Sequence, residues 1–99
     1  MPKAYVFAQI NVTDPEVYEE YRSAAPDTVL EYGGRYLVAG GDPEIVEGEQ
    51  NPGIRTLICE FPSRENLTNW YNSPEYTEIR KLRLRSANTL VWFMTGVDQ

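Results

Sequence analysis

The stretch Glu60-Phe-Pro-Ser-Arg-Glu-Asn-Leu-Thr-Asn-Trp-Tyr-Asn-Ser-Pro-Glu-Tyr76 carries most of the information about the fold. It indicates the end of a strand, a break at Pro62 and a helix that Ser63 caps, because a serine side chain accepts a hydrogen bond from a free N–H of the first turn. Ser73 and Pro74 then begin another helix, since proline fits the first helical position. The inward stripe expected for this helix is Tyr76, Ile79, Leu82 and Arg83.

The rest of the chain alternates between strand and helix signals. Alternation and β-branched content predict strands at residues 5–12, 35–39, 54–61 and 88–95, and a short strand at 44–49 that returns as a hairpin. Between the first two strands, either Thr13 or Asp14 can cap a helix, and Glu16 completes a capping box with Thr13. We expect Pro26 to break or kink that helix. Gly33-Gly34 ends it.

The predicted order β-α-β-(β)-β-α-β is typical of an α+β fold. Right-handed crossovers turn this order into a ferredoxin-like antiparallel sheet with both helices on one face, in a single domain spanning residues 1–99. The first strand directs an apolar set toward the helices, and its other face carries Tyr5, Phe7, Gln9 and Asn11. The last strand is apolar on both faces. A sheet with one solvated face alternates apolar with polar residues, so we expect a second copy of the chain to cover this face.

Composition excludes several classes of function. The net charge of −6 and a pI of about 4.5 argue against a nucleic-acid or anionic-membrane partner. Without histidine and with Cys59 alone, we expect no metal site, no haem, no other cofactor and no internal disulfide. Cys59 is predicted to be a buried, inert thiol. We expect no signal peptide and no membrane span, and hence a cytoplasmic location.

Six segments, in order along nearly the whole chain, resemble a known family. They are Val12-Thr-Asp-Pro-Glu, Tyr32-Gly-Gly-Arg-Tyr-Leu-Val, Glu47-Gly48, Glu60-Phe-Pro-Ser-Arg, Trp70-Tyr-Asn-Ser-Pro-Glu-Tyr and Leu82-Arg83. The pattern is similar to domain-of-unknown-function family 1330 of the dimeric α/β-barrel superfamily. The resemblance implies a protomer whose sheet pairs with a second sheet to form a barrel. It implies no particular reaction, since related branches include cofactor-independent monooxygenases, haem proteins and isomerases.

Charged residues on apolar faces are the first candidates for a site. Arg83 lies on an apolar helical stripe, where a cation needs a partner. It either binds a ligand carboxylate, forms an ion pair with Glu60, or extends its charged end to solvent. Arg35 follows two glycines at a strand start, which indicates either a ligand site or an ordinary helix end. Glu60 is a weak candidate for a general base if its pKa is raised, and a structural ion-pair partner if an arginine lies beside it.

Uncharged candidates complete the set. Gln9 and Asn11 either orient a ligand on the barrel-facing side or satisfy each other across the dimer. Tyr18 and Tyr71 are possible pocket walls, whereas Trp70 is predicted to be core.

The leading hypothesis is a homodimer that binds a small hydrophobic or anionic molecule between sheet and helices. The first alternative is a cofactor-independent monooxygenase or isomerase that uses Glu60 and Arg83 as base and oxyanion partner. The second is a non-catalytic assembly protein with a filled dimer core.

Overall fold

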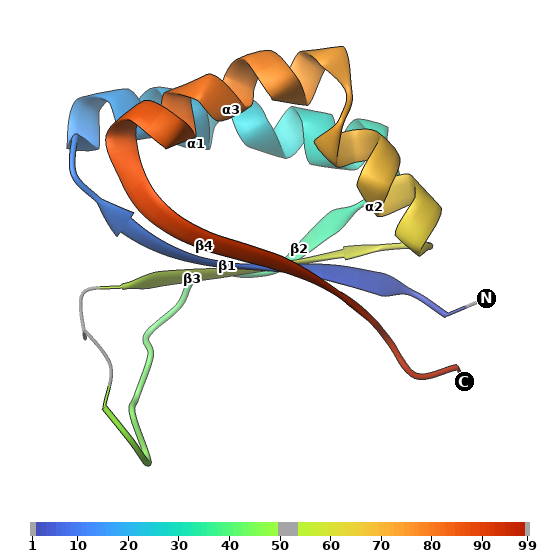
Figure 1. Cartoon of the computed structure of the whole chain (residues 1–99), viewed down its shortest axis with the longest axis horizontal. Coiled ribbons are helices and arrows are strands. Elements are labelled where there is room, and N and C mark those ends of the chain that lie inside the picture. Colours follow the sequence, from blue (N-terminus) through green and yellow to red (C-terminus); the bar gives the residue numbers. More distant parts are fainter. Residues whose placement is uncertain (1, 50–53, 99) are drawn as a thin grey trace.

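A computed structural model describes residues 2–49 and 54–98. The elements are β1 (Ala4–Val12), α1 (Pro15–Glu31), β2 (Arg35–Gly40), β3 (Arg55–Phe61), α2 (Arg64–Tyr71), α3 (Pro74–Ser86) and β4 (Ala87–Thr95). The strands form one four-stranded sheet in the order β2-β3-β1-β4, and every neighbouring pair is antiparallel. All three helices lie over the same face of the sheet (Figure 1). The predicted α+β, ferredoxin-like class is confirmed.

Each helix begins at a side chain that accepts a hydrogen bond from its first turn. The Oδ1 atom of Asp14 accepts from the Val17 N–H at 3.3 Å, so Asp14 rather than Thr13 is the cap of α1. Ser63 caps α2 and Ser73 caps α3, each at 3.1 Å. These caps satisfy donors that the helix itself leaves free. They fix where each helix starts over the sheet.

Of the two outcomes expected for Pro26, a break does not occur, and the expected strand at residues 44–49 was wrong. Pro26 does not break α1, which is one helix from Pro15 to Glu31. Pro26 removes only the hydrogen bond to the Arg22 carbonyl, and Val29 beyond it is fully buried, so packing holds the last turns in place. Residues 44–49 form no strand. They are exposed and offer no buried face to the sheet, so nothing offsets the entropy of ordering them as a strand.

The core lies between the helices and the sheet. Alternate residues of β1, from Ala4 to Ile10, are buried against the helices. Phe61 and Trp70 pack with ring centroids 5.3 Å apart, and the Trp70 ring lies 4.1 Å from that of Tyr76. The prediction that Trp70 is core is confirmed, since only 4% of it is exposed. This aromatic cluster positions α2 and α3 over the sheet.

The other face of the sheet has no helix over it (Figure 1). The register aligns Val38, Ile58, Phe7 and Trp92 in one row across all four strands. The Phe7 and Trp92 rings stack at 5.4 Å with an angle of 11° between their planes. Leu90 and Met94 lie on the same face and are exposed. We call this surface the open sheet face.

No helix among the described residues is long and apolar enough to span a bilayer.

Candidate functional site

A cavity with mostly aromatic and aliphatic walls lies between α1 and the sheet. Its volume is about 210 Å³, and we call it the main cavity. Its lining comes from α1, β2 and β3 and comprises Tyr18, Tyr21, Arg22, Ala25, Pro26, Tyr36, Ala39, Arg55 and Leu57. The walls are therefore aromatic and aliphatic, with two guanidinium groups and no carboxylate among the lining residues. A concave apolar site with a few convergent polar groups is the usual form of a small-molecule site.

Arg55 is the main polar group of this cavity. It pairs with Ile10 in the β1–β3 register, and Ile10 is fully buried beneath the helices, so Arg55 faces the helices too. Its guanidinium carbon lies 5.8 Å from the centre of the Tyr18 ring. Its Nε atom is buried and has no hydrogen-bond partner among residues 2–49 and 54–98. A buried donor without a partner is costly, so an acceptor at this atom would be favourable.

Gly40 leaves the space that the Arg55 guanidinium occupies. This glycine ends β2 with a φ of +87°, in the left-handed region that side chains rarely adopt. A Cβ atom placed there would lie 3.1 Å from Arg55 Nη2. The conformation of the strand end therefore helps to set the position of Arg55.

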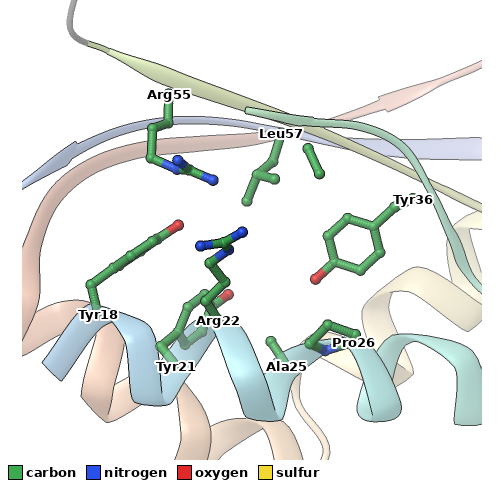
Figure 2. Close-up of a pocket in the computed structure, with 9 residues that line it drawn as sticks. Tyr18, Tyr21, Arg22, Ala25, Pro26, Tyr36, Arg55 and Leu57 are labelled. Atoms are coloured by element: carbon green, nitrogen blue, oxygen red, sulfur yellow. The ribbon is translucent and has the colours of Figure 1, made fainter. Parts of the chain in front are cut away.

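Arg22 extends from α1 into the same space. Figure 2 shows the guanidinium groups of Arg22 and Arg55 directed toward one another between Tyr18 and Tyr36. Arg22 Nη1 also bonds to Glu19 Oε2 at 3.2 Å, but both side chains are more than half exposed. Such a surface pair is weak and leaves the other donors of Arg22 free for a ligand.

A smaller inner cavity of about 30 Å³ lies deeper. It shares Tyr21, Tyr36 and Leu57 with the main cavity. Arg83 lies on it and is only 3% exposed, so the prediction that this cation is on a buried stripe is confirmed. Its Nη1 donates to Thr89 Oγ1. The ion pairs formed by the described residues do not include Arg83.

Two buried phenols separate Arg83 from the main cavity. The hydroxyl oxygens of Tyr21 and Tyr76 are 2.7 Å apart. Burial, together with the neighbouring Tyr76, raises the pKa of Tyr21 well above its ordinary value. Burial also raises the pKa of Tyr76, although the charge of Arg83 opposes the shift. Burial likewise raises the pKa of Tyr36. These phenols therefore stay protonated at neutral pH, and in the Tyr21–Tyr76 pair one hydroxyl donates to the other.

Glu60 lies on the opposite face of the sheet from Arg83. The Glu60 carboxylate accepts hydrogen bonds from Arg35 Nε at 2.9 Å and from the Tyr5 hydroxyl at 3.1 Å, and Lys3 Nζ is 3.5 Å away. Partial burial raises the pKa of the Glu60 carboxyl, but these bonds and the charges of Arg35 and Lys3 together lower it below its ordinary value. The proposed Arg83–Glu60 pair was therefore wrong, and a low pKa suits a structural carboxylate rather than a base.

The predicted site residues divide between the two faces. Tyr18 lines the main cavity, and Tyr71 and Arg83 line the inner one. Gln9 and Arg35 lie on the open sheet face, where they pair in register with Thr56 and Glu60. Asn11 borders an outer groove that shares Tyr18, Arg22 and Arg55 with the main cavity.

Tyr18 is the one residue of the main cavity that the predicted set contains, and the missed residues include Arg22, Tyr36 and Arg55. Arg55 had a usable signal in the sequence, because alternation with Leu57, Cys59 and Phe61 places it on the helix-facing side of its strand.

Cys59 is buried, as predicted, and burial raises the pKa of its thiol to about 12. Within residues 2–49 and 54–98, no three His, Cys, Asp or Glu side chains gather as a metal site would require.

Sequence comparison decides the family. A family model described as a domain of unknown function (DUF1330) matches residues 3–97. The chain belongs to the DUF1330 family. No curated protein matches this member of the family.

Solved structures similar to this DUF1330 protein share its fold at low sequence identity. A protein of unknown function from Rhodopseudomonas palustris is 15% identical with a TM-score of 0.80, covering 99% of this chain and 85% of its own. The cofactor-independent oxygenase SnoaB from Streptomyces nogalater is 7% identical with a TM-score of 0.71, covering 100% and 97%. A putative antibiotic biosynthesis monooxygenase from Caulobacter crescentus is 12% identical with a TM-score of 0.62, covering 98% and 92%. Identities this low support the fold and leave function open.

Proposed function

We propose that this DUF1330 protein is a homodimer that binds a small hydrophobic or anionic organic molecule in the main cavity. The observation that carries the proposal is the unpartnered Nε atom of Arg55, which is buried at a cavity of about 210 Å³. A cavity that served only packing would be filled, because protein interiors are close-packed. The open space therefore favours binding over a role in which this region serves only packing.

The binding proposal is tested by native mass spectrometry and by an NMR titration. The purified protein is first examined for a co-purified small molecule, and the stripped protein is then titrated with the neutral ring compounds benzamide and benzyl alcohol. We expect amide shift changes around Tyr18, Tyr36 and Leu57, which line the main cavity. The variant Ala39→Leu fills the cavity from an exposed position on β2 and should weaken binding.

The matched control is Leu84→Phe, which enlarges a side chain that is 61% exposed on α3. It should leave binding unchanged. Failure of every ring compound, neutral or charged, to perturb the cavity residues at millimolar concentration would reject the binding function.

Dimerisation through the open sheet face is the second part of the proposal. The supporting feature is the row of Val38, Ile58, Phe7 and Trp92, with the exposed Leu90 and Met94 beside it. The segment after β2 leaves the sheet on this same side (Figure 1) and exposes Val46. An apolar row that none of the described elements covers is what a second copy of the same sheet would bury.

Sedimentation velocity tests the dimer. The wild-type protein should sediment as a dimer at micromolar concentration. Phe7→Asp places an unpaired carboxylate in the proposed interface and should dissociate or unfold the protein. Leu84→Asp introduces the same charge on the exposed side of α3 and should leave the dimer intact. A wild-type monomer at these concentrations would reject this part of the proposal.

A second candidate function is a cofactor-independent oxygenase or isomerase. The observation that favours it is the hydrogen-bonded pair Tyr21–Tyr76 beside Arg83, because a neutral phenol polarised by a cation can stabilise an oxyanion. Glu60 cannot serve as the base in the cavity, since it faces the open sheet face. Oxygen uptake in the presence of 1,4-dihydroxybenzene tests this candidate. Uptake by the wild-type protein that Tyr21→Phe abolishes would support an oxygenase, and equal uptake by both would reject an oxygenase.

A further inference from the structure

We infer that the main cavity is a site for a small aromatic carboxylate, with the carboxylate held by Arg55 and the ring placed between Tyr18, Tyr36 and Leu57. This inference rests on the proposed binding function and names the class of ligand that the site takes. Its starting point is the pairing of one buried, unpartnered guanidinium nitrogen with an open aromatic cavity.

The charge of the ligand follows from Arg55. A guanidinium group is always protonated, so each of its donors seeks an acceptor. None of the residues that line the main cavity is acidic. The Nε–H and a neighbouring Nη–H of one guanidinium form a planar fork, which matches the two oxygens of a carboxylate. A neutral amide offers only one oxygen and no charge to this fork.

Arg22 adds a second, weaker positive charge. Its guanidinium approaches the same space (Figure 2), but Glu19 takes one of its donors at 3.2 Å. The Glu19 carboxylate is 62% exposed, so water screens its repulsion of an anion in the cavity. Arg55, not Arg22, is therefore the anchor, and Arg22 contributes a smaller part of the affinity.

The ring follows from the walls and the size. Tyr18, Tyr36 and Leu57 surround the space next to the two arginines. A cavity of roughly 150 Å³ accommodates benzene in another protein. The main cavity measures about 210 Å³, which is room for one ring together with a carboxylate. An inorganic anion would leave these apolar walls without a contact.

The test compares benzoate with benzamide, which has nearly the same shape and no charge, and with sulfate, which has charge and no ring. Dissociation constants come from isothermal titration calorimetry, and the Nε–H signal of Arg55 is followed by NMR. Benzoate should bind about tenfold or more tightly than benzamide, as a charge-assisted hydrogen bond would give. Benzoate should also shift the Arg55 Nε–H signal, and sulfate should bind more weakly than benzoate.

Variants assign the effect to the arginines. Arg55→Met should remove most of the preference for benzoate over benzamide and leave only the smaller part that Arg22 contributes. Arg55→Lys keeps the charge but loses the fork, and should give an intermediate affinity. Arg22→Met should cause a smaller loss. Arg64→Met is the control, because Arg64 lies over Phe93 and not at this cavity.

The outcomes separate this inference from the binding function. Benzamide and benzoate binding equally well to the wild type, or Arg55→Met retaining the full preference for benzoate, would overturn the carboxylate site while small-molecule binding stands. Sulfate binding as tightly as benzoate would overturn the aromatic part of the inference. Binding of none of the three compounds, nor of benzyl alcohol, at millimolar concentration would overturn both proposals.

Discussion

The hydroxyl groups of Tyr21 and Tyr76 share a hydrogen bond of 2.7 Å between α1 and α3, and both side chains are buried. Each phenol is therefore the partner that the other needs. The charge of Arg83 acts on Tyr76, and Tyr21 lines the main cavity. The bond thus links the packing of the helices to the wall of the proposed site.

Removing either hydroxyl leaves the other without its partner, so we expect the two single losses in the free energy of unfolding not to add in the double variant. Tyr21→Phe and Tyr76→Phe should each lower the free energy of unfolding by about 1–3 kcal/mol, because a buried polar group loses its partner. The double variant should lose less than the sum of the two. Urea denaturation of the four proteins measures this. Additive losses would mean that the two hydroxyls are not coupled in solution.

Trp70 should be the most costly single truncation in the aromatic cluster. Its Nε1 donates to Thr28 Oγ1 at 3.0 Å, and its ring contacts those of Phe61 and Tyr76. Trp70→Ala should lower the free energy of unfolding by about 3–5 kcal/mol, since a cavity remains in the core. Leu84→Ala on the exposed side of α3 should change it by less than about 0.5 kcal/mol. Thermal denaturation distinguishes them, and an unchanged melting temperature in Trp70→Ala would remove Trp70 from the core.

The fold could be predicted because its signals are local and repeated. Ser63 and Ser73 cap helices as the sequence indicates, and alternation in β1 assigns each residue to a face. Pro26 shows where local signals are insufficient. Its effect depends on what the following turn buries, and Val29 is fully buried in the core. Residues 44–49 were expected to form a strand and do not, since apolar residues without a surface to cover do not make a strand.

The site was less predictable because it depends on which face each side chain occupies. Tyr18, Tyr71 and Arg83 were expected beside a cavity and lie there. The sequence could not show which residue contacts Arg83. Glu60 was the first candidate, but it lies on the opposite face of the sheet from Arg83. Arg55 was missed because a single cation at a strand start looks like an ordinary surface residue; alternation places it on the helix-facing side, but its unpartnered Nε atom is seen only in the structure.

Arg83 and Glu60 should behave as independent residues. Arg83→Met replaces a buried cation by an apolar side chain of similar length and removes its bond to Thr89 Oγ1. Combined with Glu60→Gln, its effect on the free energy of unfolding should be additive within about 0.3–0.5 kcal/mol, as for residues without shared partners. A double-mutant cycle in urea measures this. A coupling well above that range would restore the ion pair that the structure does not contain.

Cys59 should be inert in the native protein. Burial raises the pKa of its thiol to about 12 from an ordinary value of 9.0, so almost no thiolate is present at neutral pH. A chromogenic disulfide reagent should react only after denaturation. Because the folded pKa is raised, this group's contribution to stability is complete below pH 9.0 and is lost as the pH rises toward 12. Cys59→Ser should react under neither condition, and rapid labelling of the native wild type would contradict burial.

The ionised Glu60 carboxylate should stabilise the fold at pH values above its titration range and should no longer do so at pH values below that range. Its folded pKa lies below the ordinary value of 4.5, because the bonds from Arg35 and Tyr5 and the charge of Lys3 outweigh partial burial. The unfolded chain therefore binds a proton first as the pH falls, and the contribution present above 4.5 is lost as the pH passes down through the folded pKa.

Glu60→Gln should consequently flatten the acid side of the stability profile, whereas Glu47→Gln, at an exposed position, should not. Urea midpoints measured between neutral pH and the acid limit of folding give both profiles. An unchanged acid slope in Glu60→Gln would show that the carboxylate is equally solvated in the folded and unfolded states, and that its bonds with Arg35 and Tyr5 do not hold in solution.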